Sequence, residues 1–150
     1  MSDPRDLYQQ IIIEHNKKPK NYGELEHFTH HAHGINPTCG DDIVVQVILD
    51  KDIIKDIRFH GKGCAIFKAS SSLMTVNVKG KSVADVELLI TQFRQMIRGD
   101  INATIKQNVL GGSLRIFQGI GSLPSRVKCA VLPWATLHSA LHDDKTACTE

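Results

Sequence analysis

The 150-residue sequence contains no uninterrupted apolar run of the ~18 residues that a membrane-spanning helix requires. Its opening residues, Met1–Asp6, are charged and lead into a helical pattern, which is not the apolar start of a secretory signal. The sequence also lacks a basic excess, because 18 Lys and Arg face 16 Asp and Glu for a net charge of +2. We therefore expect a cytoplasmic protein that binds neither membranes nor nucleic acid.

Cysteine is scarce as well, and the four cysteines form no Cys-x-x-Cys pair. They are Cys39, Cys64, Cys129 and Cys148. A chain of this length buries a core without disulfides, which argues against a disulfide-stapled scaffold. In a reducing compartment, cysteines in glycine-rich or helix-starting contexts favour metal or thiol chemistry. Spacing alone leaves buried, small apolar cysteines as an equal alternative.

Hydrophobic periodicity predicts an α+β fold in one domain spanning residues 1–150. The expected helices cover residues 4–17, a stretch starting near Cys64, a stretch capped by Ser82 and Asp85, and residues 125–142. Alternating apolar residues between 43 and 59 predict an antiparallel hairpin, preceded by a loop over 20–38. We expect a small antiparallel sheet with the helices on one side, an unassigned segment over 99–124, and a frayed tail over 143–150.

Three thiols and one carboxylate lie where they can serve as metal ligands. Cys39 and Asp41 are two residues apart on a loop bounded by proline and glycine. Cys64 starts a helix, whose N-terminus favours a thiolate. Cys129 falls roughly 130° from the apolar stripe of its helix, so we expect it to face away from the main core. Such a donor set suits tetrahedral Zn²⁺.

Three motifs in the same order resemble the IscU/NifU-like proteins of iron–sulfur cluster assembly. They are NPTCGD at 36–41, GKGCAI at 61–66 running into ASSSLM at 69–74, and PSRVKC at 124–129. Lys128, in place of the histidine that precedes the third cysteine of IscU-type scaffolds, and the long segment before it are similar to the SufU type. Phe67 and Pro133 depart from the family pattern. Pro133 removes a helical hydrogen bond to the carbonyl of Cys129, which predicts a kink.

The resemblance implies a zinc site of Cys39, Asp41, Cys64 and Cys129, with Arg126 nearby. It implies a zinc-dependent sulfurtransferase that receives persulfide sulfur from a SufS-type cysteine desulfurase and passes it to downstream iron–sulfur assembly proteins. The alternatives are an IscU-type scaffold that holds a transient iron–sulfur cluster, and a structural zinc module. Because the ligand set leaves a net negative charge, Arg126 and Lys128 are candidate neutralising cations.

Backbone freedom favours Cys39 as the catalytic, sulfur-accepting thiol. Cys39 lies on a loop, whereas Cys64 and Cys129 are attached to helices that resist displacement. Cys129 is the competing choice. The histidines of the 27–33 segment are either a second metal cluster or, as we favour, exposed imidazoles, and Cys148 is expected to be a free, oxidisable thiol. The clustered histidines are His27, His30, His31 and His33.

Overall fold

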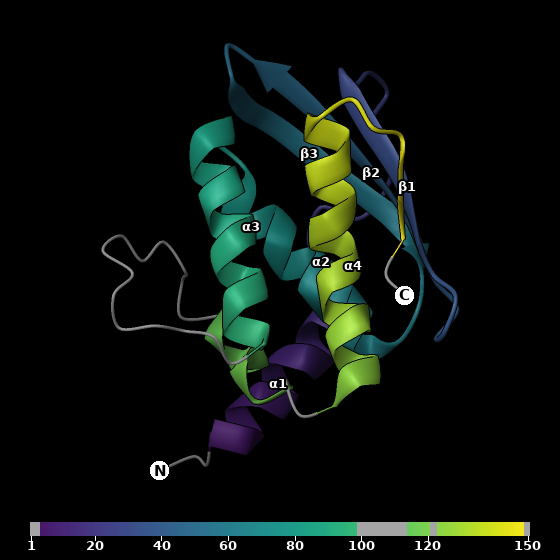
Figure 1. Ribbon diagram of the computed structural model, residues 1–150, viewed down its shortest axis with the longest axis vertical. Helices are drawn as coiled ribbons and strands as arrows, with labels where there is room; N and C mark the ends of the chain where they lie inside the picture. The colour runs from purple at the N-terminus through teal and green to yellow at the C-terminus, as the bar shows by residue number, and fades with distance from the viewer. Residues whose placement is uncertain (1–3, 99–113, 121–122, 149–150) are drawn as a thin grey trace.

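The computed structural model describes residues 4–98, 114–120 and 123–148, in which helices lie against one face of a sheet (Figure 1). The elements are α1 Pro4–Lys17, β1 His30–Asn36, β2 Asp41–Asp50, β3 Ile53–Lys62, α2 Ala65–Val78, α3 Val83–Ile97, the 3-10 helix η1 Leu114–Ile120, α4 Pro124–Leu141 and β4 Thr146–Cys148. This arrangement confirms the α+β prediction. None of the helices in these ranges combines the length and apolar character needed to cross a membrane.

The sheet is mixed and has the strand order β3-β2-β1-β4. The three strands β1, β2 and β3 pair antiparallel, and the fully buried Ile43, Val45 and Val47 alternate along β2, as their pattern predicts. β4 instead runs parallel to β1. The expected fraying of residues 143–150 is therefore wrong for 146–148, because the backbone there pairs with the free edge of β1.

The first strand was not expected, since it lies inside the segment predicted to be a loop. Its buried positions are Ala32, Gly34 and Asn36, which are small or polar and give no apolar alternation. Gly34 has a packing reason: a Cβ there would collide with the Thr136 side chain of α4. The absence of that Cβ lets α4 pack directly on β1.

The helix boundaries agree with their sequence signals. Cys64 is the N-cap of α2, and the Ser82 hydroxyl accepts a hydrogen bond from the Asp85 backbone N–H at 3.2 Å at the start of α3. α4 starts at Pro124 and continues through Pro133 to Leu141. The predicted kink at Pro133 stays a prediction, and residues 99–113 of the segment left unassigned lie outside the described residues.

A buried hydrogen-bond chain fixes α2 against α4. The Ser70 hydroxyl donates to the carbonyl oxygen of Ala130 at 2.6 Å and accepts from Nε1 of Trp134 at 3.0 Å. Ser70 and Trp134 are both fully buried, so these contacts are shielded from water. They hold the first turns of α4, which carry Cys129, in a fixed position relative to α2.

Candidate metal centre

The turn between β1 and β2 meets the second turn of α4, and three potential metal ligands converge there. Sγ of Cys39, a carboxylate oxygen of Asp41 and Sγ of Cys129 all lie within 4.8 Å of one another. Residues separated by 88 positions in the sequence (41 to 129) thus share one site. Two thiols and a carboxylate can hold a metal ion, and the chemistry of these donors suits Zn²⁺.

The β1–β2 turn leaves Cys39 exposed to solvent and buries Asp41. Asn36 and Asp41 are paired across the hairpin, and the Gly40 N–H donates to the carbonyl oxygen of Asn36 at 2.9 Å. Gly40 has φ +74°, a left-handed conformation that glycine adopts without strain. The tight turn leaves Cys39 exposed and Asp41 only 1% exposed.

Cys64 lies beside this group without being part of it. Its Sγ accepts a hydrogen bond from the Phe67 N–H at 3.4 Å, so the side chain serves as the N-cap of α2. Its backbone N–H donates to Oδ1 of Asp41 at 3.1 Å, which ties the start of α2 to the turn. Three of the four predicted ligands therefore converge, and the fourth is adjacent, with its thiol accepting from the Phe67 N–H and also in contact with the Cys129 thiol.

Cys129 is buried, with 3% of its surface exposed, and it belongs to the hydrophobic core cluster. The expectation that Cys129 faces away from the core is wrong, because the residue is part of the core cluster and its Sγ lies 3.7 Å from Nδ2 of Asn36 in β1. Burial raises the pKa of the Cys129 thiol, and its contacts with Asp41, Cys39 and Cys64 raise the pKa further. Without a cation, the chain therefore keeps a neutral thiol at this position.

Two neighbours that sequence reasoning did not single out position the carboxylate. Nδ2 of Asn36 lies 3.2 Å from Oδ2 of Asp41 and 3.7 Å from Sγ of Cys129, whereas Oδ1 of Asn36 has no partner in the described ranges. A Cβ at Gly63 would collide with Oδ1 of Asp41 and with the Phe67 ring. The available signal was their place in the motifs, directly before the Cys39 turn and directly before Cys64.

Both cations expected near the site lie on α4. Arg126 is exposed in the first turn of α4, and Lys128 is half-buried next to Cys129 in the chain. Their binding role stays a prediction. The Cys39 side chain also contacts the first turn of α4, because its Sγ lies 4.0 Å from the carbonyl oxygen of Ser125.

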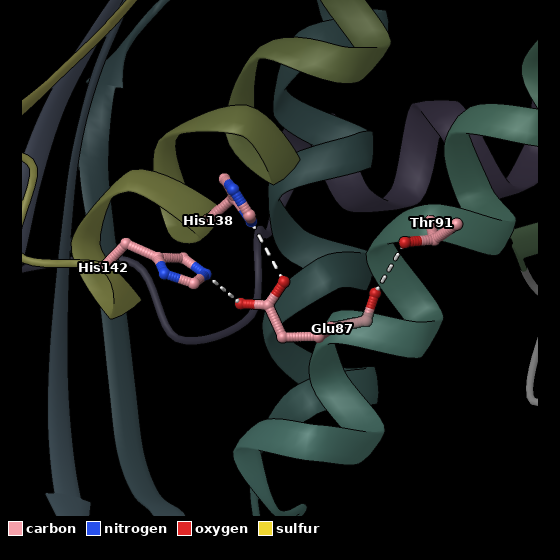
Figure 2. Close-up of polar contacts among 4 residues, drawn as sticks. All are labelled: Glu87, Thr91, His138 and His142. Atoms are coloured by element: carbon pink, nitrogen blue, oxygen red, sulfur yellow. Dashed lines mark hydrogen bonds and ion pairs between the residues drawn. The ribbon is translucent and has the colours of Figure 1, made fainter.

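The histidines at 27–33 do not gather into a ligand cluster in the part of the chain that the structure describes. His30 instead pairs with Asp143 at 3.6 Å and His33 with Asp42 at 2.7 Å. A different histidine group converges with Glu87 at the far end of α4, as Figure 2 shows. Sequence reasoning missed it, although His138 and His142 are four residues apart.

Comparison with known proteins places this geometry in a family. The model of the NifU-like N-terminal domain matches residues 7–147. The chain is 37% identical to an iron–sulfur cluster assembly scaffold protein IscU of Streptococcus pyogenes serotype M1, over 94% of this chain and 86% of that protein. It is 36% identical to the zinc-dependent sulfurtransferase SufU of Bacillus subtilis strain 168, over 90% of this chain and 89% of that protein.

A solved structure agrees with these matches. The SufU crystal structure from Fervidobacterium islandicum AW-1, described as a candidate iron–sulfur cluster assembly scaffold for the SUF system, superposes with a TM-score of 0.80. It is 32% identical in sequence, and the match covers 88% of this chain and 94% of that one. The chain belongs to the NifU-like N-terminal domain family, whose IscU and SufU members are its close homologues.

Proposed function

We propose that this protein is a zinc-dependent sulfurtransferase of the SufU type that accepts persulfide sulfur from a SufS-type cysteine desulfurase on Cys39. One observation carries the proposal: an exposed thiol, Cys39, lies within 4.8 Å of two buried ligands, Asp41 and Cys129. A purely structural zinc module needs no exposed ligand. An acceptor needs one that a partner protein can reach.

The donor set fits Zn²⁺. Cys39, Asp41 and Cys129 supply two thiols and a carboxylate, and Cys64 completes a tetrahedral set when its Sγ turns from the Phe67 N–H toward them. Bound Zn²⁺ would hold these sulfurs as thiolates at neutral pH. Asn36 orients Asp41 through its side-chain amide, as hydrogen-bonding partners of metal ligands commonly do.

The transfer step is a thiolate exchange that needs no added oxidant. The Cys39 thiolate attacks the outer sulfur of the desulfurase persulfide, a new S–S bond forms, and the old S–S bond breaks. The desulfurase cysteine leaves as a thiolate, and Cys39 carries the persulfide. Cys129 is 3% exposed and is therefore worse placed to reach a partner. Cys64 is exposed, but its Sγ accepts the Phe67 N–H as the N-cap of α2, whereas Cys39 lies on a turn.

Charged neighbours and cell compartment complete the proposal. Arg126 and Lys128 flank the site in sequence and would offset the negative charge of the ligands. A reducing cytoplasm suits the four free thiols. Downstream iron–sulfur assembly proteins would take the sulfur from Cys39.

An IscU-type scaffold is the second candidate, favoured by the relative of Streptococcus pyogenes, which is as similar as the sulfurtransferase of Bacillus subtilis. In that case the same ligands would hold a transient iron–sulfur cluster. Colour after iron and sulfide reconstitution, without persulfide on Cys39, would identify this function.

The test incubates the protein with a SufS-type desulfurase and cysteine, then locates trapped persulfides by mass spectrometry. We expect label on Cys39, and none in the Cys39→Ser variant. Cys148→Ser is the matched control, because Cys148 is also an exposed free cysteine but lies on β4. Label on Cys129 and not on Cys39 overturns the assignment, and the absence of label on every cysteine favours a structural zinc module.

A further inference from the structure

We propose that Glu87, His138 and His142 form a second metal site, which binds a divalent transition ion of the Zn²⁺ type between α3 and α4. Nδ1 of His138 lies 3.0 Å from Oε2 of Glu87, and Nε2 of His142 lies 2.9 Å from Oε1. The three ligand atoms are all within 4.8 Å of one another. Figure 2 shows both imidazoles directed at the one carboxylate.

The fold brings these residues together because α3 and α4 run antiparallel and side by side (Figure 1). Glu87 lies near the start of α3, and the two histidines lie at the end of α4. His138 and His142 are four residues apart, so both project from the same face of the helix. Their ring centroids are 4.4 Å apart.

This group is separate from the cysteine site. His138 follows Cys129 by nine positions, which is about 14 Å along a helix axis and roughly half a rotation away from it. The two sites therefore lie on opposite faces of α4, toward its two ends. The second site does not depend on the proposed sulfur transfer, and each can be tested without the other.

The donor chemistry selects the ion. Two imidazoles and one carboxylate are ligands of Zn²⁺ and of related first-row transition ions, whereas Mg²⁺ and Ca²⁺ prefer oxygen donors alone. Three protein ligands leave coordination positions open to water. The His-x-x-x-His spacing matches that of zinc metalloproteases, but Ser139 stands where those enzymes have their glutamate base. The inference is therefore binding, with no hydrolytic activity.

Metal binding requires that the ring nitrogens facing Glu87 carry no proton. A carboxylate accepts hydrogen bonds, so in the metal-free chain Nδ1 of His138 and Nε2 of His142 carry the protons that face Glu87. A metal ion takes the lone pairs of these same nitrogens. Each imidazole then keeps its proton on the other ring nitrogen, and the carboxylate becomes a ligand. This tautomer change is measurable residue by residue.

The side chains are accessible enough for an ion to enter. Their exposed fractions are 29% for Glu87, 44% for His138 and 57% for His142. The chain also offers a contrasting pair, because His60 faces Glu24 at 3.6 Å, and no second histidine among the described residues joins them in a ligand group. His60 and Glu24 can form an ion pair, but as two ligands they do not make the three-ligand group that the proposed metal site has.

The test adds Zn²⁺ or Ni²⁺ to the full chain without an affinity tag and follows the imidazole nitrogen resonances, with Mg²⁺ as the comparison ion. We expect Nδ1 of His138 and Nε2 of His142 to change from protonated to metal-bound in Zn²⁺, and to remain unchanged in Mg²⁺. Equilibrium dialysis of His138→Ala and Glu87→Gln should show one zinc ion fewer per chain than the parent.

The matched control is His60→Ala, which should keep the zinc stoichiometry of the parent. A cysteine site that binds no zinc would lower the total for every protein equally and leave the difference between His138→Ala and the parent intact. Unchanged His138 and His142 resonances at saturating Zn²⁺ and Ni²⁺, or equal zinc content in His138→Ala and the parent, would overturn the site and leave only an ion pair between helices.

Discussion

Asn36 and Asp41 close the β1–β2 turn from inside: Nδ2 of Asn36 lies 3.2 Å from Oδ2 of Asp41, and both residues are buried, at 0% and 1% exposed. The same amide also reaches Sγ of Cys129 at 3.7 Å. One side chain therefore contacts two of the proposed ligands, although it is not itself a ligand. Its effect on metal binding is separable from theirs.

Replacing Asn36 by Ala should weaken zinc binding while leaving all four proposed ligands in place. Loss of a hydrogen-bonding partner of a metal ligand typically lowers metal affinity by about 10- to 100-fold. Competition with a chromogenic chelator measures this change. Asn77→Ala is the control, because the Asn77 amide donates to the carbonyl oxygen of Leu73 within α2, on the same helix. An affinity equal to that of the parent would show that Asn36 only fills space.

Replacing Gly63 by Ala should displace Asp41. The added Cβ would collide with Oδ1 of Asp41, which accepts the Cys64 N–H, and with the Phe67 ring. We expect lower zinc content together with a lower melting temperature. Gly80→Ala is the control, because it meets nothing within 4 Å but has φ +86° and so carries backbone strain alone. It should lose stability and keep zinc, and equal zinc loss in both variants would contradict the proposed contact.

Local patterns predicted the helices well. The bounds of α1 agree with the expected 4–17, and the Ser82 cap of α3 forms as its spacing indicates. These features depend on residues a few positions apart. The burial of β1 depends on α4 lying over Gly34, and that contact spans about a hundred residues of sequence. No short stretch of the sequence contains both residues of this contact.

In the candidate metal centre, too, contacts between residues close in the sequence were predictable, and contacts between distant elements were not. Cys39 and Asp41 lie two residues apart, so one turn brings them together. The angle of Cys129 on its helix predicted that it is not part of the apolar stripe, yet other elements bury it. Sequence reasoning missed His138 and His142, although they are four residues apart, and their partner Glu87 comes from a different helix, which only tertiary structure supplies.

Replacing Asp41 by Ala and by Asn should separate its two roles. Asp41→Ala removes a ligand and leaves the part-buried Cys64 N–H without its acceptor, which weakens the link between the turn and the start of α2. Asp41→Asn keeps an oxygen at that position and loses the charge. We expect both variants to bind zinc more weakly because the carboxylate ligand is lost, but still to bind it because the thiolates remain. Only Asp41→Ala should lower the melting temperature of the metal-free protein. Zinc affinity unchanged in both would remove Asp41 from the ligand set.

Acidification should destabilise the protein through His15. Its Nδ1 lies 2.6 Å from the Ser72 hydroxyl, which also accepts the Lys20 N–H at 2.7 Å, so the hydroxyl proton is available to the neutral imidazole. Burial, and then the charge of Lys20, lower the pKa of His15 below its usual 6.5.

The unfolded chain therefore binds this proton more readily than the folded one. Stability from His15 is complete above pH 6.5 and falls as the pH drops from there through the lowered pKa. Urea unfolding of the metal-free protein between neutral pH and about pH 5 measures the slope. His15→Asn, which keeps an acceptor but does not titrate, should have a shallower slope than the parent. His27→Asn, at an exposed histidine, should keep the parent's slope. Equal slopes in all three proteins would show that His15 is not the group that couples folding to pH.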